Sequence, residues 1–278
     1  MGRMDLLGDF ASGIMTPLYY GITALLLAGH WVFTLILPAG SGWTWVLAIV
    51  GLTVAVRVLL LPLSLQAIKG KRAMLALQPR IKELQKEYGH DRERLTQEQM
   101  RLWKETGTNP FRSCLPLLLE LPIFFALYRV IEVASRFGAD GGARGFMSPA
   151  DAESLRQAMF AGAKVGDTLM MFEPISINDS WNVKILALAL IVGICGTQFY
   201  AQWRLLHSGL PPGAGEGPYA QEQKFVLYAM PVAFAVGGPS FPLGVLAHWL
   251  TWFVWTLAEQ AYITRGEPRP GSSGGMSA

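Results

Sequence analysis

Charge, cysteine and histidine are all scarce in this chain, and each shortage excludes a class of function. Charged residues make up 15% of the 278 residues, whereas a soluble domain carries about a quarter. Two cysteines, Cys114 and Cys195, lie far apart in apolar runs, and the four histidines are scattered. This pattern predicts neither a disulfide framework nor a metal site. We therefore expect no cofactor and no metal.

Catalytic signatures are missing as well. The chain contains no phosphate-binding loop of the GxxxxGK[ST] type, no HExxH pair and no GxSxG turn, and these motifs mark common enzyme sites. We expect no catalytic residue and a protein that is not an enzyme. The first residues, up to Thr16, also lack the basic and apolar regions of a removable signal peptide, so we expect none.

Apolar and aromatic residues are plentiful instead. Hydrophobic residues form 51% of the chain, and several of its nine Trp lie near the ends of apolar runs, as in proteins whose aromatic side chains sit at the membrane interface. Four runs are long enough to cross a bilayer as helices. The last run contains Gly237-Gly238-Pro239-Ser240-Phe241-Pro242, which interrupts a helix, so we read it as two spans. The four runs are Trp43–Leu65, Cys114–Ala134, Val183–Leu205 and Phe225–Ile263.

The predicted fold is thus an all-α integral membrane protein, a five-span helical bundle that we expect in the plasma membrane. An earlier segment, Pro17–Leu37, leaves two placements open. Its length permits a span, but polar and aromatic residues interrupt it, which favours a helix lying in the outer interface. Thr16 and Pro17 resemble a helix start. The segments that we expect are an outer N-terminal segment (1–42), a first span (43–65), a cytoplasmic helical hairpin (66–112), a second span (113–134), an outer loop (135–182), a third span (183–205), a cytoplasmic loop (206–224), the fourth and fifth spans (225–263) and a disordered cytoplasmic tail (264–278).

The distribution of basic residues predicts the orientation. Residues 66–112 hold 11 of the 23 Lys and Arg, while residues 135–182 hold four against six acids. Because positive loops stay in the cytoplasm, the first segment faces inside and the second faces outside, with the N-terminus outside. The basic residues of the first segment are Lys69, Lys71, Arg72, Arg80, Lys82, Lys86, Arg92, Arg94, Arg101, Lys104 and Arg112.

The cytoplasmic segment reads as two helices. Apolar residues at spacings of three and four define one helical face, and Gly89-His90-Asp91 interrupts the pattern. Thr96 with Gln99 forms a capping-box pattern that predicts the start of the second helix. On the outer side we expect a surface helix over Pro149–Ala163, with acidic residues in its first turn.

Arg57 is the residue that stands out, because it lies well inside the first apolar run. A guanidinium there costs several kcal/mol and cannot be neutralised by deprotonation. It therefore needs water or an anionic partner, unless its side chain reaches the cytoplasmic headgroups. Thr53 shares its helical face. Glu120 is a candidate partner across helices; we favour a structural ion pair over a proton relay.

Polar residues in the other spans favour a water-filled interior over a dry bundle. Such groups are expensive against lipid, although any single one is most often an interhelical hydrogen bond. They are Tyr128, Thr197, Gln198, Tyr200, Gln202, His248, Trp249, Thr251 and Trp252.

Several motifs together resemble the YidC-type insertases. The stretch from Arg57 to Leu65, RVLLLPLSL, is similar to their arginine-bearing first core helix, and QPRIKELQKEYG from Gln78 to their cytoplasmic hairpin. GTNP from Gly107 with LPIFFALY from Leu121 is similar to their second core helix. MP at Met230 and SFP at Ser240 with His248-Trp249 resemble the final hairpin. The likeness covers about 17–263 and matches the short, Gram-positive-like form, related to mitochondrial and chloroplast insertases.

The resemblance implies a function. Family members insert and help to fold membrane proteins through a hydrophilic, positively charged groove that receives an acidic outer tail, alone or beside the Sec translocon. By position, Arg57 would supply the groove charge beside Thr53, and Trp249 with Gln198 or Gln202 would complete the wall. Glu120 stands where many relatives have Gln, and His248 where Tyr is usual. If Glu120 faces the groove, it weakens the positive potential.

Implied partners are nascent membrane-protein substrates, the lipid bilayer, and, at the hairpin, the ribosome or targeting machinery. Lys82, Lys86, Arg92 and Arg94 are the candidate contacts, since their basic charge suits RNA or anionic lipid; a solvated hairpin without a partner is the alternative. Two other functions stay open. One is an assembly chaperone or scaffold without autonomous insertion. The other is a small-solute transporter, which the lack of repeats disfavours.

Overall fold

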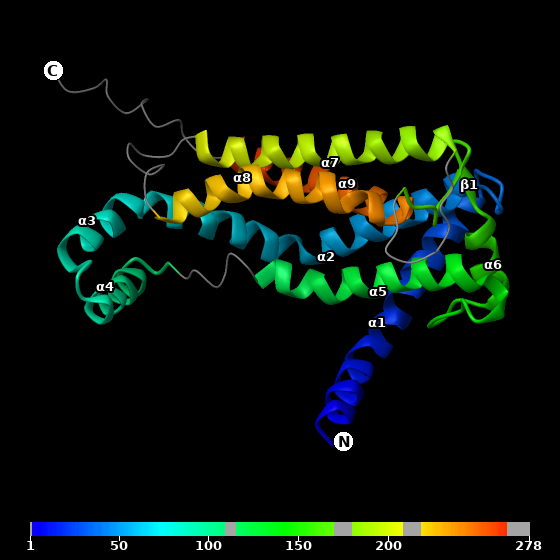
Figure 1. Ribbon diagram of the computed structural model, residues 1–278, viewed down its shortest axis with the longest axis horizontal. Coiled ribbons are helices and arrows are strands. Elements are labelled where there is room, and N and C mark those ends of the chain that lie inside the picture. Colours follow the sequence, from blue (N-terminus) through cyan, green and yellow to red (C-terminus); the bar gives the residue numbers. More distant parts are fainter. Residues whose placement is uncertain (1, 109–114, 170–179, 208–217, 266–278) are drawn as a thin grey trace. The chain divides into compact units, whose positions relative to one another are not determined.

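The computed structural model describes residues 2–108, 115–169, 180–207 and 218–265 (Figure 1). Nearly all of them are helical, which confirms the all-α class. The longer helices are α1 (Gly2–Thr34), α2 (Gly42–Ala76), α3 (Gln78–Tyr88), α4 (Arg92–Glu105), α5 (Leu115–Phe137), α6 (Pro149–Gln157), α7 (Trp181–His207), α8 (Pro218–Gly237) and α9 (Leu243–Arg265). Two short 3-10 helices, η2 (Gly138–Asp140) and η3 (Gly238–Ser240), and an antiparallel pair, β1 (Met159–Phe160) and β2 (Ala163–Lys164), complete the described part.

Two helices of the described residues are long and apolar enough to cross a membrane, Gly42–Met74 within α2 and Trp181–Arg204 within α7. They correspond to the first and third predicted spans. α5 is not among them because it carries four charged side chains. The predicted count of five spans is therefore not confirmed by length and composition. The break near Gly237 is confirmed, since η3 separates α8 from α9.

Several predicted boundaries were wrong. Pro17 does not start a helix but lies inside α1, which begins at Gly2, and the helix continues there although proline removes one backbone hydrogen bond. The helix of the first predicted span does not stop at Leu65, since α2 continues through Pro62 to Ala76. α8 begins at Pro218, inside the expected loop 206–224, and α9 reaches Arg265, into the expected tail. Cys114 and the rest of that tail, 266–278, lie outside the described residues.

The chain divides into two compact units. Unit 1 comprises Met1–Leu59, Leu118–Cys195 and Ala233–Trp252, and unit 2 comprises Leu60–Leu117, Gly196–Val232 and Phe253–Ala278. The core of unit 1 is apolar, and its largest fully buried side chains are Leu26, Trp45, Ile49, Leu52, Leu127, Ile131, Leu155, Ile194, Leu243 and Leu246. Trp45 belongs to this core although it lies near the start of an apolar run, and its indole Nε1 donates to Ser154 Oγ at 3.1 Å.

The segment of unit 1 that was predicted to be an outer surface helix is partly a β-hairpin. α6 ends at Gln157 instead of Ala163, because the backbone turns extended at Ala158 and β1 pairs with β2. Ser148 caps α6 in a reciprocal capping box with Asp151. The chain after β2 then covers the start of α9: Leu243 N–H donates to the Asp167 carbonyl at 3.0 Å, and Gly244 N–H to the Val165 carbonyl at 2.8 Å. These bonds satisfy amides that a helix start leaves open.

Unit 2 contains the charged hairpin of α3 and α4, which pack against each other around the buried Ile81 and Leu102. The predicted break near Gly89 is confirmed, but the predicted cap was wrong. Asp91, not Thr96, caps α4, and its carboxylate accepts from Arg94 N–H at 3.0 Å. Thr96 instead lies one turn inside the helix, where its hydroxyl donates to the Arg92 carbonyl at 2.8 Å.

A methyl group at Gly42 is expected to destabilise unit 1. The start of α2 lies so close to β1 that a Cβ there would overlap the Met159 backbone, and such overpacking costs about 1–3 kcal/mol. Gly42→Ala should lower the unfolding temperature in detergent. Gly21→Ala is the matched control, because its Cβ would meet open space in α1 and should leave the temperature unchanged or raise it. Equal temperatures for the two variants would contradict the packing.

The carboxyl of Glu153 is expected to titrate well below its usual range. Hydrogen bonds from the Arg156 guanidinium, then from Gln157, lower its pKa from 4.5 to about 2. A lowered pKa stabilises the folded state above pH 4.5, and this contribution is lost as the pH falls through about 2. Comparing the unfolding temperatures of wild type and Glu153→Gln from pH 7 to 2 should show a difference that shrinks below pH 4.5. A difference independent of pH would argue against the charged contact.

Candidate functional site

Arg57 lies in α2 with only 4% of its surface exposed. The preceding turns of α2 carry the core residues Trp45, Ile49 and Leu52, so the same helical face continues into the interior at Arg57. A guanidinium stays charged under all relevant conditions. Its burial therefore requires compensating groups close by, and unit 1 supplies them.

Glu120 is the first of these groups. It lies in α5, is 8% exposed, and its Oε1 is 3.3 Å from Nη1 of Arg57. The ion pair that the sequence suggested is therefore present. Both side chains are largely withdrawn from solvent, so water screens their attraction far less than at a protein surface. Together the two side chains carry no net charge.

Trp252, in α9, contacts both members of this pair. Its indole Nε1 donates to Oε2 of Glu120 at 2.6 Å. The Cζ atom of Arg57 lies 4.3 Å from the centre of its ring, which is a cation–π distance. Arg57 thus contacts both Glu120 and Trp252, and Glu120 contacts both Arg57 and Trp252. We call Arg57, Glu120 and Trp252 the charged cluster.

A second polar pair lies one turn away from Arg57 along α2. The hydroxyl of Thr53 is 2.7 Å from the Ile49 carbonyl and 2.8 Å from Nδ1 of His248, and both residues are buried. The hydroxyl has one proton, which it donates to the carbonyl, so it accepts from His248. His248 therefore carries its proton on Nδ1. This bond fixes the imidazole of α9 against α2.

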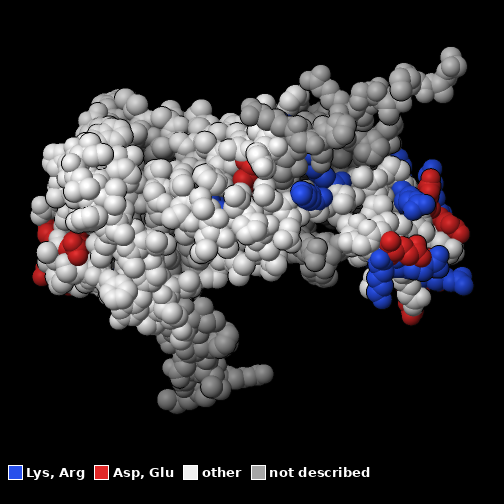
Figure 2. Space-filling view, turned by 180° about the vertical axis from the view of Figure 1, so that it is seen from behind, with Lys and Arg blue, Asp and Glu red and all other residues white. Residues whose placement is uncertain are grey.

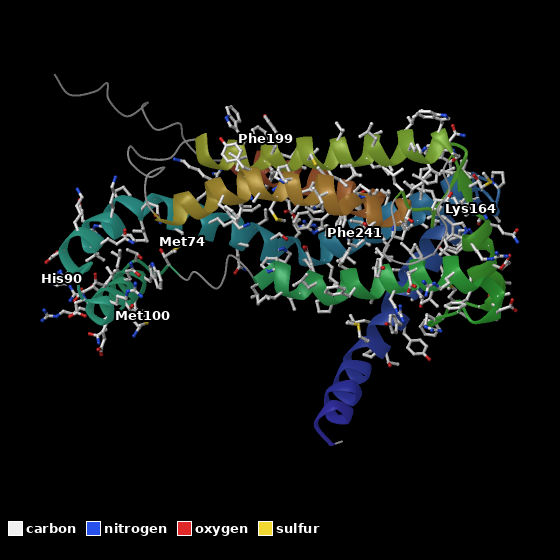
Figure 3. The ribbon with its side chains drawn as sticks, in the orientation of Figure 1. Met74, His90, Met100, Lys164, Phe199 and Phe241 are labelled. Atoms are coloured by element: carbon white, nitrogen blue, oxygen red, sulfur yellow. The ribbon has the colours of Figure 1, made fainter. Side chains whose placement is uncertain are left out.

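Trp249, the predicted wall residue, lies in an aromatic cluster. Its ring stacks on Phe124 at 5.1 Å and meets Phe234 and Phe241 edge-on at 4.9 and 4.6 Å. Phe241, at the turn before α9, is labelled in Figure 3. Such ring pairs contribute about 0.5–1.5 kcal/mol each beyond their buried area. This packing holds α5, α8 and α9 of unit 1 together beside the charged cluster.

The structure thus brings together three predicted site residues, Arg57, Thr53 and Trp249, in unit 1. The other two, Gln198 and Gln202, belong to α7 in unit 2, where Gln198 is buried and Gln202 half-buried. Sequence analysis noted Trp252 as polar but missed its role as donor and ring. The spacing of four between His248 and Trp252, which places both on one helical face, is the signal that could have found it.

The hairpin residues proposed as partner contacts are displayed to solvent. Lys86, Arg92 and Arg94 are exposed, and Lys82 is half-buried. Figure 2 shows basic and acidic side chains crowded together on this hairpin. His90 at its tip and Met100 on α4, labelled in Figure 3, are also exposed. Among the described residues, no group of three or more His, Cys, Asp and Glu could hold a metal ion.

Comparisons with known proteins identify the family. The model of a family described as 60Kd inner membrane protein matches residues 36–269, most of the chain. The chain belongs to this family. It is therefore a protein of the cell membrane, in keeping with the apolar helices α2 and α7.

Three relatives of the chain share one name. A membrane protein insertase YidC of Streptomyces avermitilis is 36% identical over 97% of this chain, which spans 61% of that protein's length. Proteins of the same name from Tropheryma whipplei and Mycobacterium tuberculosis are 31% and 30% identical over 96% and 94% of the chain. The chain spans 89% and 75% of their lengths.

Replacing one partner of the buried ion pair should destabilise the folded protein more than replacing both partners. Removing one member of a buried ion pair costs about 3–5 kcal/mol, whereas apolar residues in place of both can be neutral or stabilising. We expect Glu120→Met to lower the unfolding temperature strongly and Arg57→Met/Glu120→Met to recover most of the loss. Thermal unfolding in detergent measures both variants. Additive losses in the double variant would mean that the two side chains do not depend on each other.

Proposed function

We propose that this protein is a membrane protein insertase, and that the charged cluster with the Thr53–His248 pair forms part of a hydrophilic groove for client chains. The observation that carries the proposal is the buried guanidinium of Arg57 in a helix apolar enough to cross the membrane. A charge in such a place is costly and therefore points to function. The names of the relatives add independent support.

The groove would lower the free-energy barrier to moving a short polar tail of a client into the membrane. Desolvating charged and amide groups in lipid is expensive unless hydrogen-bonding partners replace the water. The guanidinium and the indole N–H are such partners, and a client carboxylate is the group they suit best. The apolar helix of the client then moves into lipid, and the hydrophobic effect drives that step without a nucleotide. By resemblance, Gln198 or Gln202 would extend the polar wall.

The five-span topology remains part of the proposal. α2, α5, α7, α8 and α9 would be the spans, with the hairpin of α3 and α4 in the cytoplasm, where its basic residues belong. α1 would lie in the outer interface. Its exposed Trp31 suits that position because an indole combines an apolar body with a polar N–H.

Partners beyond the clients would meet the hairpin. Lys86, Arg92 and Arg94 are exposed, and no ion pair joins their side chains to another described residue. Such basic groups suit the phosphates of ribosomal RNA or of anionic lipid. Work beside the Sec translocon is a further proposal from the resemblance.

Insertion by the purified protein tests the function. Proteoliposomes containing only this chain should protect the outer tail of a single-span client, whose short tail is acidic, from added protease. Arg57→Ala should reduce protection roughly tenfold or more, because the loss of a charged hydrogen-bond donor costs about 1.5–3 kcal/mol. Arg57→Lys should keep part of it, because charge remains while the planar fork is lost.

Arg144→Ala is the matched control, since this exposed arginine lies in the outer segment and its loss changes the net charge equally. It should insert the client like wild type. Because no ribosome is present, the assay tests the groove and not the hairpin. Protection no better than empty liposomes, with several clients, would refute autonomous insertion and favour an assembly scaffold. Equal protection by wild type and Arg57→Ala would leave insertion in place but remove Arg57 from it.

A further inference from the structure

The carboxylate of Glu120 occupies the position that a client's acidic group would need. One of its oxygens faces Arg57 Nη1 at 3.3 Å, and the other accepts from Trp252 Nε1 at 2.6 Å. The guanidinium also lies over the Trp252 ring, 4.3 Å from its centre. A cation and a neutral hydrogen-bond donor from two different helices thus converge on one carboxylate. Any other carboxylate entering this position would meet the same two groups.

The ion pair itself is loose. A charge-assisted bond between a guanidinium and a carboxylate is usually about 2.7–2.9 Å long, so a separation of 3.3 Å is longer than the best geometry. The indole bond at 2.6 Å is short by comparison. Glu120 is therefore held more closely by Trp252 than by the cation that it neutralises. An incoming carboxylate with better geometry could compete for Arg57.

The helix backbone next to Glu120 also has one hydrogen bond fewer than a regular helix. Pro122 lies inside α5, and a proline in a helix removes one backbone hydrogen bond and its ring crowds the carbonyl four residues earlier. That carbonyl belongs to Leu118, so the missing bond spans the turn that contains Glu120. A small rotation of this turn therefore breaks one bond fewer than it would in a regular helix.

We propose that Glu120 is an exchangeable internal counter-ion: it holds the anion position beside Arg57 and Trp252 at rest, and a client carboxylate displaces it during insertion. This rests on the proposed insertase function and specifies its substrate preference. Because Arg57 and Glu120 together carry no net charge, long-range attraction to a positive site is weak. Selection for acidic tails is instead a competition between two carboxylates. Glu120 therefore sets how strongly an acidic tail is preferred over a neutral one.

The test compares two clients that differ only by Asp→Asn at one position in the outer tail. Insertion of each is measured by protease protection in proteoliposomes of the full chain, and the acidic-to-neutral ratio is the readout. Glu120→Gln keeps the shape of the side chain and an acceptor for Trp252 but removes the competing charge. We expect it to raise the ratio about three- to tenfold, since removing the negative charge beside the guanidinium strengthens its attraction for a client carboxylate. Arg57→Gln/Glu120→Gln, which removes both charges, should bring the ratio close to one.

Glu259→Gln is a matched control from the same protein. Glu259 is buried in α9 and likewise accepts from an indole, Trp255 Nε1, at 2.7 Å. Its replacement should leave the ratio at the wild-type value. Thermal unfolding of each variant in detergent identifies any that fail to fold.

The outcomes separate this inference from the function on which it rests. A raised ratio in Glu120→Gln, with Glu259→Gln unchanged, supports exchange. An unchanged ratio in Glu120→Gln, with insertion still above empty liposomes, overturns it and leaves the insertase intact. Should Glu120→Gln fail to fold, the double variant decides, and a ratio still at the wild-type value would overturn the proposal. Wild type that inserts neither client would remove the insertase function and this inference together.

Discussion

The permanent charge of Arg57 is the constraint around which the centre of unit 1 is organised. A lysine or a carboxylic acid in an apolar helix can lose its charge by a shift in pKa, but a guanidinium cannot. Its neighbours must therefore supply the compensation that water supplies elsewhere. Glu120 provides opposite charge, and Trp252 provides both a π face for the cation and a hydrogen bond for the anion. α2, α5 and α9 are thus tied together by polar contacts within an apolar setting.

The segment that follows β2 in unit 1 determines whether these contacts can form. The carbonyls of Val165 and Asp167 receive the first amides of α9, which fixes where that helix begins. From that start, His248 and Trp252 fall on one face at a spacing of one helical turn, while Trp249 turns toward Phe124 and Phe241. A shift of one residue in this start would rotate α9 by about 100° and separate Trp252 from Glu120. The loop after β2 is distant in sequence from Arg57, yet it determines what Arg57 contacts.

Under the proposed function, the opposite charge of Glu120 changes how Arg57 would recognise a client. A lone positive charge would attract any acidic tail over a distance, whereas a close ion pair has only a short-range field. Recognition then depends on contact, on hydrogen-bond geometry and on exchange. Such a site can hold a polar tail without binding it tightly, because the resting partner competes for the same donors. A transient stay is what a protein that passes clients on to lipid requires.

The amino-acid sequence alone determined the all-α class, the apolar character of α2 and α7, the break before Pro239 and the presence of a charged hairpin. These features depend on composition, on periodicity and on residues that interrupt helices, all of which act locally. It also singled out Arg57, because a charge within an apolar run is conspicuous, and it suggested Glu120 as partner.

Local sequence patterns failed where two possible helix starts competed. Pro17 looked like a helix start and Thr96 like a cap, yet α1 runs through the first and Asp91 caps α4 instead. Only the tertiary structure decided that Trp252 completes the charged cluster, that His248 binds Thr53, and that the segment after α6 folds into a β-hairpin. These contacts join residues far apart in the chain, and their geometry depends on the rotation and start of whole helices, which no local pattern specifies.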